Sequence, residues 1–449
     1  MKLRFTKFNI TNIVLSILVY FFGLYLLTDE MLLGANPTAE QPFSFFTLFF
    51  LFCIITFFVL IALNVIKKNY KPSYAFLCGL LIIFIIGVIN YFLMPQKRNF
   101  SFNDYNGSIV SFSYSLTDTK IFQYRLSFFI LFLLFFFTID VVPKIFKNFD
   151  ILTFYALLFI SSIIVLAIIS YFIEGSNYLN FLKNLSSENP YVYTVKSLLM
   201  HRNNYGILLF GAICSTLYLH SKSKKFYWFI FDAFFLINML FTLCKTGLIL
   251  SILLNAIYLI MRFCLSYKDN KKRNLITLLT ICSVCVVFLI SVVVFLSMKG
   301  KLNSFIDNFF SKNVFSTVES RFVLYKNAID VVKSTNIVVG AGYKVFNDIL
   351  FNINGYTTFS HNGVLEIFGS GGIVLLSFSA LFLIYFVYHS IKDFNDDKNG
   401  AMFGLILMFI SLLYTMFESG SIIFSSTTDY LYLSILLFVP LMKKHPFLY

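Results

Sequence analysis

Charged residues are scarce in this sequence. Asp, Glu, Lys and Arg make up 12% of the 449 residues, whereas hydrophobic residues make up 59% and the mean hydropathy is +0.82. A soluble protein of this length needs far more polar residues to cover its surface. Long apolar stretches recur instead, and a helix needs about 20 such residues to cross the hydrocarbon core of a bilayer. We therefore predict an all-α, polytopic transmembrane protein in which residues 1–449 form a single membrane domain without a separate soluble domain.

Cysteine is absent from the long polar loops. All seven cysteines lie in or beside apolar runs, so no disulfide framework is predicted. Cys282 and Cys285 lie three residues apart on one helix face, but no histidine or acid is near them in the sequence. Packing is therefore favoured over a metal pair. The sequence contains no carboxylate cluster suited to a cation, and we expect neither a metal nor another cofactor.

Negative charge is also in short supply, and the formal net charge is +14. In a soluble protein this excess would suggest a nucleic-acid partner. Here many of the Lys and Arg residues lie in short connections between apolar segments, where positive charge sets membrane topology. No nucleic-acid partner is therefore expected.

About twelve apolar segments are candidate membrane spans. They cover 11–28, 44–66, 73–94, 122–142, 151–173, 203–220, 226–243, 246–264, 274–298, 361–388, 401–417 and 428–442. The basic start and long first run predict an uncleaved first span rather than a signal peptide. Short Lys/Arg-rich connections alternate with longer or less basic ones, which places both termini in the cytoplasm and the long connections outside.

The longest outer connection covers about 299–360, between the ninth and tenth predicted spans. Ser316 and Glu319 have the spacing of a capping box, which predicts a helix over 319–335. The apolar residues Phe322, Tyr325, Ile329 and Val332 recur there at helical spacing. This pattern predicts an amphipathic helix lying along the outer membrane surface. Arg321 falls in the first turn, where the helix dipole disfavours a cation, and this mismatch suggests an anionic partner. A surface or snorkelling arginine is the alternative.

Polar residues gather again at FSHNGVLEIFGSGG, residues 359–372, where the tenth predicted span begins. Ser360 or Asn362 is suited to cap the helix, which would place His361 at its N-terminus on the outer face. A helix N-terminus favours anions and disfavours a protonated imidazole, so His361 is expected to stay neutral and able to accept a proton. Glu366 would orient the ring, pair with a cation or act as a structural partner. A capped helix with a bystander histidine is the alternative.

Three cations are predicted on the same side of the membrane as His361. They are Arg202 at a span entry, Lys245 in a short hairpin between two spans, and Arg321 in the long outer connection. Guanidinium and ammonium groups bind phosphate oxygens well, so this combination suits a phosphorylated substrate. A flanking lysine without further function is the alternative for Lys245.

Two glycines in the outer connection, Gly340 and Gly342, flank Ala341 in the stretch IVVGAGYKVF. They allow a tight turn or a close approach of the backbone to another group. The pair is not a dinucleotide fingerprint, because neither a third glycine nor a βαβ context follows.

Four segments resemble, in order, motifs of the O-antigen polymerase and O-antigen ligase superfamily, and together they cover about residues 200–390. HRNNYGILL is similar to its N-x-[FY]-[AG] span entry, and TLCKTGLILSIL to its S-R-[GT]-x-x-[LV] helix start, with Lys245 in place of the usual arginine. SRFVLYKNAIDVVKSTNIVVGAGYKVF is similar to its R-x-x-x-[WY]-x-x-A…G-x-G-x-x-x-F segment. FSHNGVLEIFGSGGIVLL is similar to its H-N-x-[YL]-L-x-x-x-x-x-x-G segment.

The resemblance implies a metal-independent, inverting glycosyltransferase that uses glycans carried on undecaprenyl pyrophosphate at the outer face of the bacterial cytoplasmic (inner) membrane. His361 would be the general base for an acceptor hydroxyl. Arg321, a catalytic residue with His361, would bind the pyrophosphate together with Arg202 and Lys245. Lysine is a point charge and cannot make the bidentate contact of arginine. The supporting residues would be Asn203, Asn362, Glu366, Gly340 and Gly342.

Several functions remain open at this point. A polymerase would join repeat units of an O-antigen, capsule or exopolysaccharide, and is favoured over a ligase that transfers finished glycan to lipid A core or protein. The partners implied are the lipid-linked glycan, membrane lipid, and a chain-length regulator and flippase of the same pathway. A transporter or flippase of lipid-linked sugar is the alternative of another class, but it would place ionisable residues near the midplane. An inactive membrane scaffold is a third reading.

Overall fold

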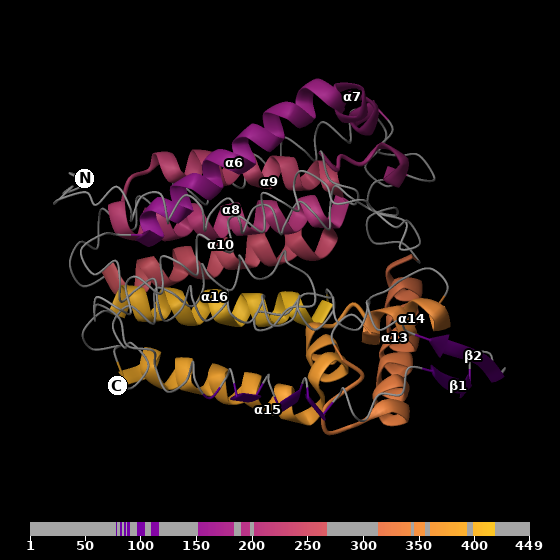
Figure 1. The fold of residues 1–449 in the computed structure, drawn as a ribbon. Coiled ribbons are helices and arrows are strands. Elements are labelled where there is room, and N and C mark those ends of the chain that lie inside the picture. Colours follow the sequence, from indigo (N-terminus) through magenta and orange to yellow (C-terminus); the bar gives the residue numbers. More distant parts are fainter. Residues whose placement is uncertain are drawn as a thin grey trace, which may run out of the picture. The chain divides into compact units, whose positions relative to one another are not determined.

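The computed structural model describes part of the chain, drawn as coloured elements in Figure 1. The described residues are 97–103, 109–115, 151–183, 190–197, 202–266, 313–342, 345–354, 360–392 and 398–417, with single positions between 78 and 89. The predicted spans 11–28, 44–66, 122–142, 274–298 and 428–442 lie outside these residues, as does most of 73–94.

Six predicted spans coincide with helices of the structure. These are α6 (Ile151–Ile173), α8 (Arg202–Ser223), α9 (Tyr227–Thr242), α10 (Lys245–Ser266), α15 (Gly363–Lys392) and α16 (Lys398–Phe417). Lys245–Phe263 and Gly363–Tyr385 are long and apolar enough to cross a membrane. A third candidate is Phe159–Ile173 with Gly175–Lys183, two helices bent by 75°. The described residues therefore confirm a helical membrane protein, while the number of spans and the topology stay predictions.

A β-hairpin lies in the stretch 95–121, which was predicted only as an outer connection. Strand β1 (Lys97–Asn103) pairs antiparallel with β2 (Ile109–Ser115), and Ser101 lies opposite Ser111. The two serine hydroxyls are 3.3 Å apart on an exposed face. Both strands alternate polar and aromatic residues in sequence, which is the period of a strand rather than a helix. The all-α prediction missed this signal because each run is short.

The chain divides into two compact units. The first contains residues 1–155, 321–391 and 411–449, and the second contains residues 156–320 and 392–410. The predicted site residues fall in both units, so each unit is described separately.

In the second unit, α8 is the most buried of the described helices. Every residue from Tyr205 to His220 is buried, and α8 contacts both α9 and α10 (Figure 1). The α9–α10 connection is a tight turn in which Leu243 has a positive φ of 49°. At the start of α8, a Cβ on Gly206 would lie 2.6 Å from Cβ of Cys244. The absence of a side chain at Gly206 thus lets the start of α10 pack against the first turns of α8.

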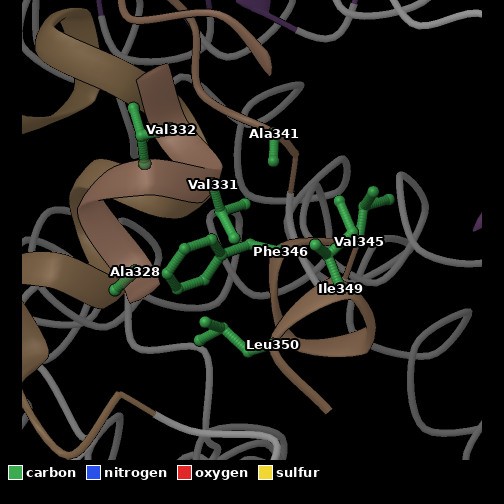
Figure 2. Packing of buried hydrophobic residues seen from close by; sticks show 8 residues of the cluster. All are labelled: Ala328, Val331, Val332, Ala341, Val345, Phe346, Ile349 and Leu350. Atoms are coloured by element: carbon green, nitrogen blue, oxygen red, sulfur yellow. The ribbon is translucent and has the colours of Figure 1, made fainter. Parts of the chain in front are cut away.

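In the first unit, a small apolar core joins α13 (Asn313–Thr335), α14 (Val345–Asn354) and the start of α15. Figure 2 shows its members, with the Phe346 ring beside Ala328 and Val331. The cluster comprises Ala328, Val331, Val332, Ala341, Val345, Phe346, Ile349 and Leu350, and Leu365 and Phe368 of α15 pack against it. The core therefore fixes α13 and α14 against the start of α15, which directly follows the turn that contains His361.

The start of α13 differs from the prediction. The helix begins at Asn313, so Ser316 and Glu319 lie inside it and are not a capping box at its N-terminus. Arg321 consequently lies about two turns beyond the helix start, since one turn takes 3.6 residues. The dipole effect falls off within the first turn, so the predicted mismatch at Arg321 does not arise.

Candidate functional site

His361 lies in the turn that opens α15, next to the residue that caps the helix. Oδ1 of Asn362 accepts hydrogen bonds from the backbone N–H of Val364 at 3.0 Å and of Leu365 at 3.2 Å. Two of the N–H groups that a helix start leaves unpaired are satisfied in this way. Asn362 is thus the N-cap, one of the two residues that the sequence suggested for this role.

The backbone at His361 is held in an uncommon conformation. Its φ is 53°, in the left-handed region, which costs a non-glycine residue about 1–2 kcal/mol. Neighbouring helices hold the turn. The hydroxyl of Tyr325 on α13 lies 3.4 Å from the carbonyl oxygen of His361 and 3.1 Å from that of Met416 on α16. Nδ2 of Asn362 lies 3.5 Å from the same Met416 oxygen. The half-buried imidazole is therefore carried by a turn whose direction is fixed.

Glu366 is almost completely buried one turn into α15, with 1% of its surface exposed. Its Oε1 accepts hydrogen bonds from the N–H of Ser360 at 2.7 Å and from the hydroxyl of Ser360 at 2.8 Å. Its Oε2 accepts a hydrogen bond from Nδ2 of Asn347 on α14 at 2.9 Å. Donors of this kind compensate for the burial of a carboxylate. Of the roles open in the sequence, these contacts support that of a structural partner, joining α14 and the residue before His361 to α15.

The helix α15 is broken at Gly372, which has φ 62° and ψ −159°. A backbone amide or carbonyl that loses its helical partner in an apolar setting costs roughly 2–7 kcal/mol if it stays unpaired. Residues 336–342, here called the covering segment, supply replacement partners. The hydrogen bonds run from Ile373 N to Ile337 O at 2.9 Å, from Val374 N to Val338 O at 3.1 Å, and from Ala341 N to Gly369 O at 2.7 Å.

This close approach of two backbones requires glycine on both sides. Gly340 has a φ of 70°, and a Cβ there would lie 2.6 Å from both the oxygen of Gly369 and the nitrogen of Gly372. A Cβ on Gly372 would lie 2.3 Å from the oxygen of Val338. Gly342 also has a positive φ, of 103°. The close approach predicted for the Gly340–Gly342 pair is therefore an approach to α15.

Arg202 and Lys245 each begin a helix in the second unit. Arg202 is the first residue of α8 and is followed by Asn203, and Lys245 is the first residue of α10. The contact between Gly206 and Cys244 brings the two helix starts together. Both cations are half-buried. Two basic side chains and two helix N-termini therefore lie close together where α8 and α10 begin. The positive charge concentrated there favours the binding of an anion.

The same unit contains a buried carboxylate that sequence reasoning missed. Glu174 lies at the bend between α6 and α7 (Gly175–Lys183). Its Oε2 accepts hydrogen bonds from the N–H of Lys196 at 3.2 Å and of Ser197 at 2.8 Å, and from the hydroxyl of Ser170 at 3.1 Å. The signal in the sequence was a single acid directly after an apolar run. Ser170 lies one helical turn before it, but Lys196 and Ser197 lie too far along the chain for the sequence to indicate them.

Polar residues at the other end of α8 were also missed. Asp232 is buried inside α9, and the hydroxyl of Thr216 on α8 lies 3.2 Å from its Oδ1. Nδ1 of His220 lies 2.8 Å from the hydroxyl of Tyr258 and 3.1 Å from Nη1 of Arg262. These groups join α8 to α9 and α10. Asp232 is thus an ionisable residue within a predicted span.

The structure groups the predicted site residues into two sets. The first unit contains Arg321, Gly340, Gly342, His361, Asn362 and Glu366, and the second contains Arg202, Asn203 and Lys245. Within the first set, α13 carries both Arg321 and, one turn later, the Tyr325 that contacts the His361 turn. In the part of the chain that the structure describes, no group of three or more His, Cys, Asp or Glu side chains is arranged to hold a metal ion.

Part of the chain matches the model of a known family. The model of the O-antigen ligase family (Wzy_C) matches residues 230–380, from α9 into α15. The resemblance inferred from the motifs is confirmed over this segment, which contains Lys245, Arg321 and His361. It supports a glycosyl-transferring membrane enzyme of polysaccharide biosynthesis, of the O-antigen ligase or polymerase type, and implies a lipid-linked glycan as substrate. No curated protein and no solved structure matches the chain significantly.

Proposed function

We propose that this chain, with an O-antigen ligase segment at residues 230–380, polymerises oligosaccharide repeat units carried on undecaprenyl pyrophosphate. The reaction would take place at the outer face of the bacterial cytoplasmic membrane and build a surface polysaccharide. One observation carries the proposal: within the matched segment, His361 is held in a braced turn at the start of α15. A fixed imidazole is suited to act as a general base, because its ring nitrogen can be held within hydrogen-bond reach of the hydroxyl whose proton it takes.

In the proposed reaction His361 takes the proton of an acceptor hydroxyl. The acceptor oxygen attacks the anomeric carbon of the donor sugar from the face opposite the pyrophosphate. The bond from that carbon to the pyrophosphate oxygen breaks, undecaprenyl pyrophosphate leaves with the electron pair, and the configuration at the anomeric carbon is inverted. No metal takes part in this scheme. Fixed cations lower the barrier because they stabilise the negative charge that develops on the leaving oxygen.

Each of the three predicted cations has a role in this scheme. Arg321 belongs to the helix that contacts the His361 turn and would stabilise the charge next to the reacting carbon. Arg202 and Lys245 begin two neighbouring helices and would bind the pyrophosphate together with the N–H groups of those helix starts. Lys245 would contribute one charge without the bidentate geometry of arginine.

A defined undecaprenyl-pyrophosphate oligosaccharide, given to the purified protein, tests the proposal. We expect longer lipid-linked products from the wild type. We expect none from His361→Ala or Arg321→Ala, although both proteins should still insert. Lys326→Ala, at an exposed position of the same helix as Arg321, is the matched control and should retain transfer. Wild-type product lengths from His361→Ala would refute the assignment of the base.

The same assay separates polymerase from ligase. Lipid A core, or a protein acceptor, is added beside the lipid-linked oligosaccharide. A polymerase lengthens the lipid-linked chain whether or not the other acceptor is present. A ligase gives product only on the added acceptor. That result would show that the protein is a ligase and not a polymerase.

Transport of a lipid-linked sugar is a second candidate, favoured by the burial of Asp232 within α9. Ionisable residues at membrane depth often mark a transport pathway. The described contacts of Asp232, however, go to Thr216 of α8 and Asn255 of α10. Flipping of the glycolipid by purified protein in vesicles, without any glycosyl transfer, would favour this candidate over the enzyme.

A further inference from the structure

The break in α15 lies within a segment that is apolar enough to cross a membrane. Gly363–Tyr385 has a mean hydropathy of 2.2, and Gly372 lies near its middle. In hydrocarbon no water is present to satisfy backbone groups, so non-helical backbone is tolerated only where protein covers it. The covering segment 336–342 provides this cover through its hydrogen bonds to residues 369–374. The covering segment must therefore extend to the depth of the break.

One side of the covering segment is apolar and exposed. Ile337 is 49% exposed and Val338 is 54% exposed, whereas the next residue, Val339, is buried. The sequence between Lys333 and Lys344 carries no charge. An uncharged, apolar surface of this kind is compatible with hydrocarbon, where a charged side chain would be costly.

Three of the four backbone N–H and C=O groups of Ile337 and Val338 are paired within the protein. The N–H of Val338 donates to Oδ1 of Asn336 at 2.9 Å, and the carbonyl oxygens of Ile337 and Val338 accept from α15. The N–H of Gly340 donates to the Asn336 carbonyl at 2.8 Å. In water, exposed backbone groups can bond to solvent and need no such pairing, whereas in lipid they require it.

The exposed pair also continues a row of exposed apolar side chains on α15. The row consists of Ile373, Leu381, Ile384, Tyr388 and Ile391. Successive members are three, four or eight residues apart, so they lie on one face of the helix. On a membrane span such a face contacts acyl chains. The N–H of Ile373, at one end of the row, bonds to Ile337, so Ile337 and Val338 extend the row beyond the break.

We propose that Ile337 and Val338 are inserted into the apolar layer of the bilayer leaflet on the side where α15 begins. The covering segment is then a lipid-contacting surface, and its partner is the acyl chains of the bilayer. This surface follows from the break, the paired backbone and the exposed row, and it does not depend on which reaction the protein catalyses.

The single tryptophan of the chain makes a direct test practical. Trp228→Phe gives a background without tryptophan, into which Val338→Trp is introduced, and the protein is reconstituted with lipids that carry bromine on their acyl chains. Bromine quenches only tryptophan that contacts the acyl chains, whereas acrylamide quenches tryptophan that contacts water. We expect Val338→Trp to lose emission with brominated lipid, to resist acrylamide and to emit at shorter wavelength than a tryptophan in water.

Two matched positions calibrate the result in the same background. Leu381→Trp lies on the exposed row of α15 and should behave as Val338→Trp does. Lys326→Trp replaces an exposed, charged side chain of α13 and should be quenched by acrylamide. Acrylamide quenching of Val338→Trp would overturn the proposal. Resistance to both quenchers would also overturn it, because the residue would then be covered by protein. Ile337→Trp repeats the test if Val338→Trp does not elute as a folded protein.

Discussion

A single buried carboxylate fixes the residue that precedes His361. The three hydrogen bonds that Glu366 accepts from Ser360 and Asn347 hold α14 and the helix start together. The side chain touches no reacting atom in the proposed scheme, so its role is to position. The same carboxylate could not be assigned from the sequence, because Asn347 lies nineteen residues earlier and nothing local indicates that the two side chains meet.

Glu366→Ala should therefore lower both stability and activity. Donors left unsatisfied in a buried site cost about 1–3 kcal/mol, so we expect a lower thermal unfolding temperature in detergent. Because the His361 turn is loosened, we expect kcat for glycosyl transfer to fall more than the affinity for the lipid-linked donor. Lys326→Ala is the control. Unchanged stability together with unchanged kcat would show that the turn is held without Glu366.

His361 allows its backbone and its imidazole to be tested separately. Asparagine tolerates the left-handed conformation of this turn but cannot act as a base. His361→Asn should thus keep the wild-type unfolding temperature while transfer falls by roughly 10²–10⁴-fold, the usual contribution of a general base. Substantial transfer by His361→Asn would mean that another group takes the proton. His361→Gly, which also fits the turn, should be equally inactive.

At the scale of elements, the interruption of α15 depends on two glycines that face each other. A Cβ on Gly372 would meet the Val338 carbonyl, and the positive φ adds a penalty of about 1–2 kcal/mol. Gly372→Ala and Gly340→Ala should each lower the yield of folded protein and its unfolding temperature. Gly175→Ala is the matched control, because no heavy atom lies within 4 Å of a Cβ built there. Equal behaviour of Gly340→Ala and Gly175→Ala would contradict the described pairing.

The helix α13 shows where sequence periodicity reaches its limit. The sequence predicted a helix here, and it is present. The helix buries Ala328 and Val331 in the apolar core, and Leu324 is buried as well. Phe322, part of the predicted apolar stripe, is 65% exposed. A helix with apolar residues on two sides offers two candidate faces. Only the position of α14, which local spacing does not specify, decides which face is buried.

At the scale of the whole molecule, the helices of six predicted spans followed from the sequence, whereas the contacts between them did not. Six predicted spans appear as helices because each is specified by its own run of apolar residues. The bend at Glu174 and the break at Gly372 depend on partners distant in the chain, namely Ser197 and the covering segment. The family motifs predicted Arg321 and His361 as catalytic residues, but not the contacts that brace the turn at His361.

The packing of α8 against α10 gives the last prediction. If Lys245 binds the donor pyrophosphate as proposed, Lys245→Ala should weaken donor binding by about 10- to 100-fold, the loss of one charge-assisted hydrogen bond of about 1.5–3 kcal/mol. Lys245→Arg should retain binding, since it keeps the charge and adds a second donor. The KM for the lipid-linked donor measures this effect. Lys224→Ala, at an exposed position between α8 and α9, is the control. Equal KM values for the two alanine variants would show that Lys245 does not bind the donor.

The order of the chain has a consequence for how the protein is made. The covering segment lies before α15 in the sequence, so it leaves the ribosome first. When α15 is synthesised, the backbone groups that its break exposes already have their partners available nearby. The interrupted span can thus be completed as soon as it emerges, without waiting for any later part of the chain.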